Sequence, residues 1–387
     1  MSALFLVLLF FVTYTYLGYP LLLYVWSSIF PGKVKKYVRS YEPFVSIIIA
    51  AHNEEINIEN RINNLICQVY PLGKLEIIVV SDGSDDRTDI IMKQLESKIH
   101  NRFPFYNGLL KFLSYRPMRG KSYAINIGVA NATGDIVVFA DSRQRFSNCA
   151  IKQLVSNFAD EQVGCVSGEL FIEDISTSGN SLKQIDIISY WEFEKWLRKL
   201  ESRTGSVPGA TGAIYAIRKK LFRTLPEKII VEDVFIPLSV RMQGFRVAFD
   251  SSAVAYDKIS KDISLEKKRK IRTLAGNWQL LITQPQLINP LLNPLWFKFL
   301  SHKIFRLFVP YCLIILLIIV MCLRTLLSNI ILVIMLICIF LTVISPLTRN
   351  LGIIYKISKL CKSIIILNFF AFLSPFKFIG YSRKKIW

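Results

Sequence analysis

Long apolar stretches lie near both ends of the chain. The stretch Ala3–Phe30 carries no charged residue and is long enough to cross a bilayer core of about 30 Å. It lacks a basic segment before it and a clear cleavage site, so we expect an anchor rather than a removed signal peptide. Basic residues follow at once, which places the amino terminus outside and the next domain in the cytoplasm. They are Lys33, Lys35, Lys36 and Arg39.

The apolar stretches near the other end are shorter and interrupted. Phe308–Leu323 and Ile330–Ile344 are separated by a short polar turn, which predicts an out-and-back hairpin across the membrane. The last stretch, Ile364–Ile379, is broken by a proline. A full crossing there would leave the basic residues 382–385 outside, against the charge rule. We therefore expect a re-entrant or interfacial segment, or a hairpin that begins near Leu351.

The middle of the chain alternates between two patterns. Short apolar runs rich in β-branched residues predict buried strands, and segments with apolar residues at helical spacing predict helices. This alternation predicts an α/β fold with a mainly parallel sheet and right-handed crossovers. The expected strands are Val45–Ala50, Leu75–Val80, Leu110–Ser114, Ile136–Ala140 and Val163–Glu169. The expected helices are Ile56–Tyr70, Arg87–His100, Ser122–Asn131, Ser189–Leu200 and Glu266–Gln279.

Composition favours a membrane protein that binds phosphate groups. The 387 residues are 52% hydrophobic, with a mean hydropathy of +0.39 and a net charge of +20. Such a charge suits nucleic acid, anionic lipid or anionic small substrates. The sequence has no helix-turn-helix, zinc-finger or aromatic RNA-binding signature, so we expect membrane and phosphate partners and no nucleic acid. The seven cysteines are scattered without a metal-binding spacing, which is typical of a reducing compartment.

Acidic residues follow two of the expected strands. Asp82 and Asp141 stand at the carboxyl ends, where open α/β sheets bind their ligands. Asp141 is the first candidate for holding a metal ion or a sugar, with a helix N-cap as the alternative, and Asp82 can bond a base or ribose. Gly120 and Lys121 open a helix nearby, where a lysine and helix amides can hold a diphosphate. The patterns GxxxxGK[ST] and GxGxxG are absent, which argues against P-loop nucleotidases and dinucleotide dehydrogenases.

Three features of the second half of the chain suggest catalytic or ligand-binding roles. Gly205–Ala213 is rich in glycine, which lets a backbone approach a ligand closely. Glu232 and Asp233 follow a short apolar run, as a general base and its partner would, although a helix start gives the same pattern. Arg269 and Arg272 share a helix face and can point together at a phosphate or at the membrane surface.

The ordered set of these motifs from Phe44 to Gln279 resembles the family-2 inverting glycosyltransferases. It looks most like their membrane-embedded, processive branch, the cellulose, hyaluronan and poly-N-acetylglucosamine synthases. No single motif is specific, but their order and spacing are. In chain order they are Ala51-His52-Asn53-Glu54, Ser81-Asp82-Gly83-Ser84, Arg119-Gly120-Lys121, Asp141, Gly209–Ala213, Val231-Glu232-Asp233 and Arg269–Thr273.

The resemblance implies a Rossmann-like GT-A domain flanked by transmembrane helices. It implies inverting transfer from a nucleotide sugar, with a UDP-sugar as the expected donor, at the cytoplasmic face of a multi-pass cell-membrane protein. The product would be an extracellular or capsular polysaccharide, with single-sugar transfer to a lipid as the alternative. A transporter or a nucleic-acid-binding membrane protein is the remote alternative. The implied segments are a transmembrane helix (1–30), a basic linker (31–43), a nucleotide-sugar half (44–145), an acceptor half (146–285), an interfacial segment (286–305) and carboxyl-terminal membrane segments (306–387).

The resemblance also assigns roles to residues. Asp233 would be the general base with Glu232 beside it, and Asp141 would hold Mg²⁺ or Mn²⁺. The nucleotide sugar would contact Ala51, His52, Asn53, Glu54, Asp82, Gly120, Lys121, Asp141, Arg269 and Arg272. A lipid or growing glycan acceptor would contact Thr211, Gly212 and Ala213, and an accessory export subunit is a further expected partner.

Three positions depart from the family pattern. Arg143 stands where the second acid of Asp-x-Asp is expected, so a cation either loses a ligand or is partly replaced by the guanidinium. Arg269 stands for the glutamine of Gln-x-x-Arg-Trp, and Thr273 stands for its tryptophan. The aromatic platform for an acceptor sugar is therefore missing at that position, which bears on processive elongation more than on sugar transfer.

Overall fold

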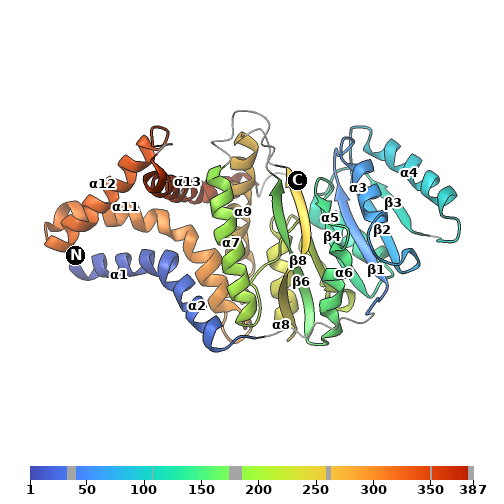
Figure 1. Cartoon of the computed structure of the whole chain (residues 1–387), viewed down its shortest axis with the longest axis horizontal. Helices are drawn as coiled ribbons and strands as arrows, with labels where there is room; N and C mark the ends of the chain where they lie inside the picture. Colours follow the sequence, from blue (N-terminus) through green and yellow to red (C-terminus); the bar gives the residue numbers. More distant parts are fainter. Residues whose placement is uncertain (33–40, 107, 174–184, 259–262, 349–350, 382–387) are drawn as a thin grey trace.

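The computed structural model describes the chain except residues 33–40, 107, 174–184, 259–262, 349–350 and 382–387. A mixed sheet with helices on both faces forms one side of the molecule, and the long apolar helices extend from the other (Figure 1). Within these described residues, four helical stretches are long and apolar enough to cross a membrane. They are Ser2–Ile29, Trp296–Leu323, Leu326–Ile344 and Gly352–Gly380.

The sheet has eight strands in the order β3-β2-β1-β4-β7-β6-β8-β5. The neighbours β3, β2, β1 and β4 are parallel, as expected, and β6 pairs parallel with β8. However, β7 runs antiparallel to both β4 and β6, and β5 runs antiparallel to β8, so the sheet is mixed rather than mainly parallel. Strand direction depends on the crossover, which an apolar run does not encode. The strands are β1 (Val45–Ala51), β2 (Leu75–Asp82), β3 (Leu110–Tyr115), β4 (Ile136–Ala140), β5 (Arg145–Phe146), β6 (Val163–Glu173), β7 (Ile214–Arg218) and β8 (Arg246–Lys258).

Helices cover both faces of the sheet, so the central strands are apolar on both sides. Ile47 and Ile49 of β1 pack into a core layer on one face, while Ile48 packs into the layer on the other. The helices of this domain are α3 (Ile58–Ile66), α4 (Thr88–Arg102), α5 (Lys121–Asn131), α6 (Ala150–Ser156), α7 (Ile185–Arg203), α8 (Glu232–Met242) and α9 (Ile263–Thr283). Short 3-10 turns lie at Leu72–Lys74, Asn157–Ala159, Lys219–Leu221 and Pro285–Ile288.

The candidate membrane-spanning stretches differ in two places from the sequence-based expectation. The last one is a single helix from Gly352, without the expected break at Pro375. A proline leaves the carbonyl four residues earlier without its helical donor, and here the Ser374 hydroxyl donates to the Ala371 carbonyl at 2.7 Å. The expected boundary at 305 also falls inside a continuous helical stretch. The elements are α1 (Ser2–Thr13), a π-helical turn (Tyr14–Gly18), α2 (Tyr19–Ile29), α10 (Trp296–Phe299), a second π-helical turn (Leu300–Ile304), α11 (Phe305–Leu323), α12 (Leu326–Ile344) and α13 (Gly352–Tyr381).

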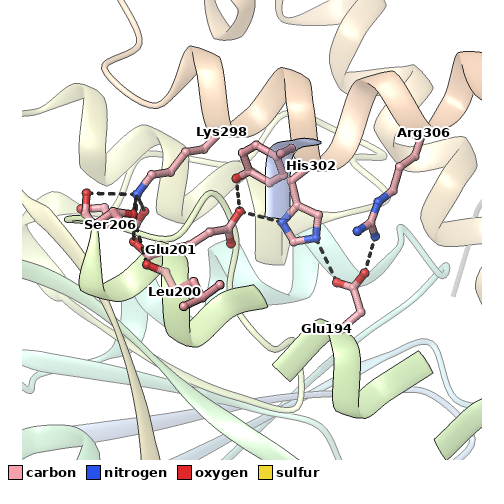
Figure 2. Close-up of polar contacts among 9 residues, drawn as sticks. Glu194, Leu200, Glu201, Ser206, Lys298, His302 and Arg306 are labelled. Atoms are coloured by element: carbon pink, nitrogen blue, oxygen red, sulfur yellow. Dashed lines mark hydrogen bonds and ion pairs between the residues drawn. The ribbon is translucent and has the colours of Figure 1, made fainter. Parts of the chain in front are cut away.

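A buried charge network joins the catalytic domain to the membrane-spanning helices. His302 lies between two glutamates of α7, with Nδ1 2.8 Å from Glu201 Oε1 and Nε2 3.0 Å from Glu194 Oε2 (Figure 2). Carboxylates only accept hydrogen bonds, so both ring nitrogens donate and the ring is an imidazolium. Tyr19 of α2 donates to Glu201 at 2.6 Å, and Arg306 of α11 bonds Glu194. Burial raises the pKa of Glu194, but Arg306 and His302 outweigh it and hold that pKa well below its usual range.

Candidate active site

Lys121 bridges the two halves of the catalytic domain. Its Nζ lies 2.8 Å from Asp141 Oδ1 and 2.6 Å from Glu232 Oε1. Asp141 follows β4, while Lys121 and Glu232 begin α5 and α8, so three separate elements converge on one ammonium. Burial works against the charges, but the two carboxylates raise the pKa of Lys121 and the lysine lowers the pKa of Asp141. This arrangement holds the lysine charged at the carboxyl edge of the parallel strands.

Asp233 lies beside this bridge, in the first turn of α8. Burial, followed by the neighbouring Glu232, raises the pKa of Asp233 to about 6. Within the part of the chain that the structure describes, its carboxylate makes no hydrogen bond, and it stands next to Gly212. A Cβ built on Gly212 would lie only 3.1 Å from Asp233 Oδ2. A carboxylate that titrates near neutral pH and is open on one side can accept a proton from a bound hydroxyl.

Polar contacts of Thr211 hold the predicted acceptor loop, residues 209–213. The Thr211 hydroxyl donates to the Gly168 carbonyl at 2.8 Å, and Arg198 of α7 donates to that hydroxyl at 2.6 Å. Thr211 and Ala213 are both 5% exposed, so Gly212 alone of the three predicted acceptor residues lies more open. Arg198 was not among the sequence-predicted residues, because nothing in its local pattern separates it from a charge on the face of a helix.

Asp82 shapes the turn that begins α5. Its two carboxylate oxygens accept the backbone amides of Arg119 at 2.6 Å and Gly120 at 2.7 Å. Gly120 has a φ of +103°, a conformation that favours glycine. The His52 ring, from the turn after β1, bonds the Asp82 carbonyl at 2.8 Å. The structure thus gives Asp82 a role in positioning the turn, and its contact with a base stays a prediction.

The turn after β1 is fixed to the turn after β2. Asn53 has a φ of 56°, and its side-chain oxygen accepts the Asp85 amide at 2.8 Å. The Glu54 amide donates to the Thr88 hydroxyl at 2.8 Å. Ala51 ends β1 at the same edge. The predicted nucleotide-binding residues of the first half therefore gather at the carboxyl ends of β1, β2 and β4, as the sequence analysis expected.

Arg143 stands where a second metal ligand was expected, and its side chain pairs with an acid of β8. Its guanidinium makes two bonds to Asp257 of β8, at 3.1 and 2.6 Å, and the Gln144 amide bonds the same carboxylate at 3.0 Å. Its charge is therefore matched by Asp257. The sequence analysis did not identify Asp257, which is distant along the chain and belongs to no motif.

The helix α9 supplies a cation from the other side. Arg272 lies close enough to Asp141 to help lower the pKa of that carboxyl. Arg269 instead pairs with Glu266 at 2.8 Å. Trp278 donates to Ser374 of α13 at 3.0 Å, so its indole is engaged in helix packing. Of the two predicted arginines of α9, Arg272 is therefore the one that lies near the Lys121 bridge.

The side chains near Asp141 are sufficient for a cation only if it is shared with a substrate. No cluster of three or more His, Cys, Asp or Glu side chains suited to a metal occurs among the residues searched, which are those that the structure describes. Mg²⁺ is often bound through one or two carboxylates together with substrate phosphates. Asp141 can supply the one carboxylate, because only one of its oxygens bonds Lys121. The residues present fit that minimal form of site.

Comparison with known protein families shows which family of enzymes has this sequence pattern. The family model described as Glycosyl transferase family 2 matches residues 46–225. The model described as Glycosyl transferase family group 2 matches residues 136–346, which is more than half of the chain. The chain is a family-2 glycosyltransferase. The expected enzyme class is thereby confirmed for the domain that carries the Lys121 bridge and Asp233.

Two curated bacterial proteins are similar to this glycosyltransferase. It is 27% identical over 247 residues to the probable glycosyltransferase YdaM of Bacillus subtilis, covering 62% of this chain and 56% of that protein. It is 23% identical over 242 residues to poly-β-1,6-N-acetyl-D-glucosamine synthase of Staphylococcus aureus, covering 62% and 55%. The chain thus spans little more than half the length of these relatives.

A solved structure shares the whole arrangement. The mannosyltransferase PcManGT from Pyrobaculum calidifontis, in complex with GDP-Man and Mn²⁺, superposes with a TM-score of 0.68 at 20% identity. The match covers 95% of this chain and 99% of that one. At this identity the likeness concerns the fold alone, and it confirms the expected GT-A domain with flanking apolar helices.

Proposed function

We propose that this glycosyltransferase transfers a sugar from a nucleotide-sugar donor with inversion, using Asp233 as the general base. The observation that carries the proposal is the position of Asp233, an open carboxylate with a pKa of about 6 beside the Lys121 bridge. It would remove the proton of an acceptor hydroxyl as that oxygen attacks C1 of the donor sugar. Glu232, through its ion pair with Lys121, would hold the start of α8, and with it Asp233, at a fixed distance from the donor site.

The leaving diphosphate would lie at the carboxyl edge of the parallel strands. Lys121 and Arg272 place two cations there, and helix α5 starts there with its free amides. Fixed charges of this kind stabilise the negative charge that develops on the leaving group. A divalent cation held by Asp141, when bound, would add Lewis-acid stabilisation of the diphosphate. The GDP-Man and Mn²⁺ of the Pyrobaculum enzyme are consistent with such a donor site.

The membrane location and the product extend this proposal. Four apolar helices and a basic segment after the first one support a multi-pass protein with its catalytic domain in the cytoplasm. Similarity to the Staphylococcus aureus synthase supports a polysaccharide as the product. An accessory export subunit is a further partner that the motif resemblance alone implies. UDP-sugars are the first donors to test, because the motif resemblance implies them.

Transfer of one sugar to a lipid is the second candidate. Thr273 replaces the aromatic platform of the processive enzymes, and Trp278 is engaged with Ser374. Arg198 and Lys303 lie near Asp233 and act on its pKa. Cations on the acceptor side of the base favour an acceptor that carries a phosphate over a neutral glycan.

The test is transfer by the purified protein in lipid nanodiscs, supplied with labelled UDP- and GDP-sugars. Asp233→Asn should lower the rate by about 10²–10⁴-fold, the usual value of a positioned base. Asp135→Asn is the matched control, since Asp135 is exposed before β4. A long polymer would establish the synthase, and a lipid with one added sugar would establish the second candidate. Near-normal turnover by Asp233→Asn would show that Asp233 is not the general base.

A further inference from the structure

A groove lies where the catalytic domain meets the ends of two membrane-spanning helices. Its volume is 740 Å³, and its walls come from the end of α2, the end of α8, the start of β8 and the start of α10. It is separate from the catalytic site. Asp233 begins α8 whereas Arg241 lies in its last turn, roughly 12 Å further along the helix axis.

Three cations line this groove, and two of them have structural partners. Lys298 donates to four oxygens at the end of α7 and in the following turn, among them the carbonyls of Glu201 and Ser206 at 2.8 and 2.9 Å (Figure 2). All four are carbonyl or hydroxyl oxygens, so no carboxylate is among the hydrogen-bond acceptors of this ammonium in the described part of the chain. Arg246 donates to the carbonyls of Gly205 and Gly32 at 2.7 and 3.2 Å.

Arg241 is the cation that is available for a ligand. Its Nη1 makes one long bond, 3.3 Å, to the Gly244 carbonyl, and its Nε is buried without a partner in the described part of the chain. A guanidinium has five N–H donors, so most of its hydrogen-bonding capacity is unused. Glu161 is the one acid among the described residues that line the groove, and it is exposed. The wall is therefore positive overall and offers donors.

A second, apolar groove adjoins the first. It runs along the outer face of α2 with a volume of 490 Å³, and Trp26 lines both grooves. Leu21 and Phe30 are 63% and 69% exposed there. The other lining residues are Gly18, Leu22 and Val25. A cationic groove thus continues into an apolar one at a tryptophan, the side chain that prefers the membrane interface.

We propose that the two grooves together bind one anionic phospholipid. Its phosphate would lie against Arg241 in the cationic groove, and one acyl chain would lie along α2. The site stands at the correct depth, because the spans Ser2–Ile29 and Trp296–Leu323 both have an end at this groove. Basic pockets between membrane helices on the cytoplasmic side are suited to anionic head groups.

Native mass spectrometry of the full chain in a neutral detergent tests the site. Phosphatidylglycerol should bind as one saturable lipid, at least about tenfold more tightly than phosphatidylcholine, because the cations that line the groove repel the choline ammonium of the zwitterionic head group. Arg241→Gln should weaken phosphatidylglycerol binding about tenfold, while Arg241→Lys should keep most of it. Arg223→Gln, an exposed cation outside the groove, is the matched control and should bind like the parent protein.

Two further measurements test whether the phosphate belongs to a lipid and where the acyl chain of that lipid lies. Glycerol 3-phosphate should not displace the lipid at equal concentration, and phosphatidylglycerol with a brominated acyl chain should quench fluorescence less in Trp26→Phe than in the parent protein. Equal affinities for the two lipids, equal effects of Arg241→Gln and Arg223→Gln, or loss of binding in Arg241→Lys as well would overturn the charge contact. Displacement by glycerol 3-phosphate would overturn the proposal that the bound ligand is a phospholipid.

Discussion

At the residue scale, Asp233 combines two influences that favour its protonated form. Partial burial removes water from the carboxylate, and Glu232 places a second negative charge beside it. Lys121, Lys303 and Arg198 act in the opposite direction, so the pKa stays at about 6 rather than rising further. A base with this pKa is ionised at neutral pH yet still basic enough to accept a hydroxyl proton. The balance depends on groups from α5, α7, α8 and the π-helical turn Leu300–Ile304.

The rate of transfer should follow this titration. Asp233 must be deprotonated to act as a base, so the rate should be flat above its pKa of about 6 and should fall about tenfold per pH unit below it. A pH profile of kcat/KM between pH 4.5 and 8.5 measures this directly. A profile that stays flat down to pH 4.5 would assign proton removal to another group.

Gly212 should be required for the geometry of the base. Substitution Gly212→Ala places a Cβ 3.1 Å from Asp233 Oδ2, so the carboxylate or the loop must shift by a few tenths of an ångström. We expect kcat to fall roughly tenfold with little change in thermal midpoint, since catalysis is sensitive to small displacements. Gly209→Ala is the control, because its Cβ would meet Val234 at an ordinary 3.4 Å. Equal rates for the two variants would contradict a tight fit at Gly212.

At the element scale, the segment after β4 separates the two charges of the Asp-x-Asp position. Asp141 turns towards α5 and bonds Lys121, whereas Arg143 turns towards β8 and bonds Asp257. Asp257 ties up the guanidinium, which makes Arg143 a poor substitute for a metal at the diphosphate. The geometry therefore favours a cation shared by Asp141 and the donor.

Chelation should then inactivate the enzyme. After treatment with EDTA and dialysis, we expect transfer to fall at least tenfold and to return with Mn²⁺ or Mg²⁺, because the leaving diphosphate loses its largest local charge. The thermal midpoint should stay unchanged, since Lys121 still neutralises Asp141. Undiminished transfer in EDTA would show that Lys121 and Arg272 are sufficient for the leaving group.

The elements that the sequence predicted are those with a strong local pattern. The runs in β1, β2 and β4 are apolar on both faces and end at polar turns, so both the strands and the edge where the predicted site residues gather could be predicted. The reversal at β7 and the Arg143–Asp257 pair depend on contacts between distant segments. Asp82 was identified as a site residue, but its bonds to the turn before α5 could not be read from the Asp-Gly-Ser pattern alone.

At the scale of the whole molecule, the catalytic domain and the membrane helices meet through charge rather than through apolar packing alone. Glu194 and Glu201 of α7 face His302, with Tyr19 and Arg306 completing the set. The five side chains come from three helical segments that are far apart in the sequence. Each helix end is thereby fixed to α7, and α7 in turn carries Arg198 to the acceptor loop. The network thus couples the membrane helices to the position of the site.

His302→Ala should therefore destabilise the junction strongly. It would leave Glu194 and Glu201, which are 5% and 0% exposed, as two neighbouring buried carboxylates without their shared cation. Removing one partner of a buried ion pair typically costs about 3–5 kcal/mol, so we expect a lower thermal midpoint in detergent. His100→Ala, at the exposed end of α4, should be neutral. The triple variant His302→Leu, Glu194→Gln, Glu201→Gln removes the charges together and should recover part of the loss. If His302→Ala melted like His100→Ala, the network would not be what holds the catalytic domain to its membrane helices.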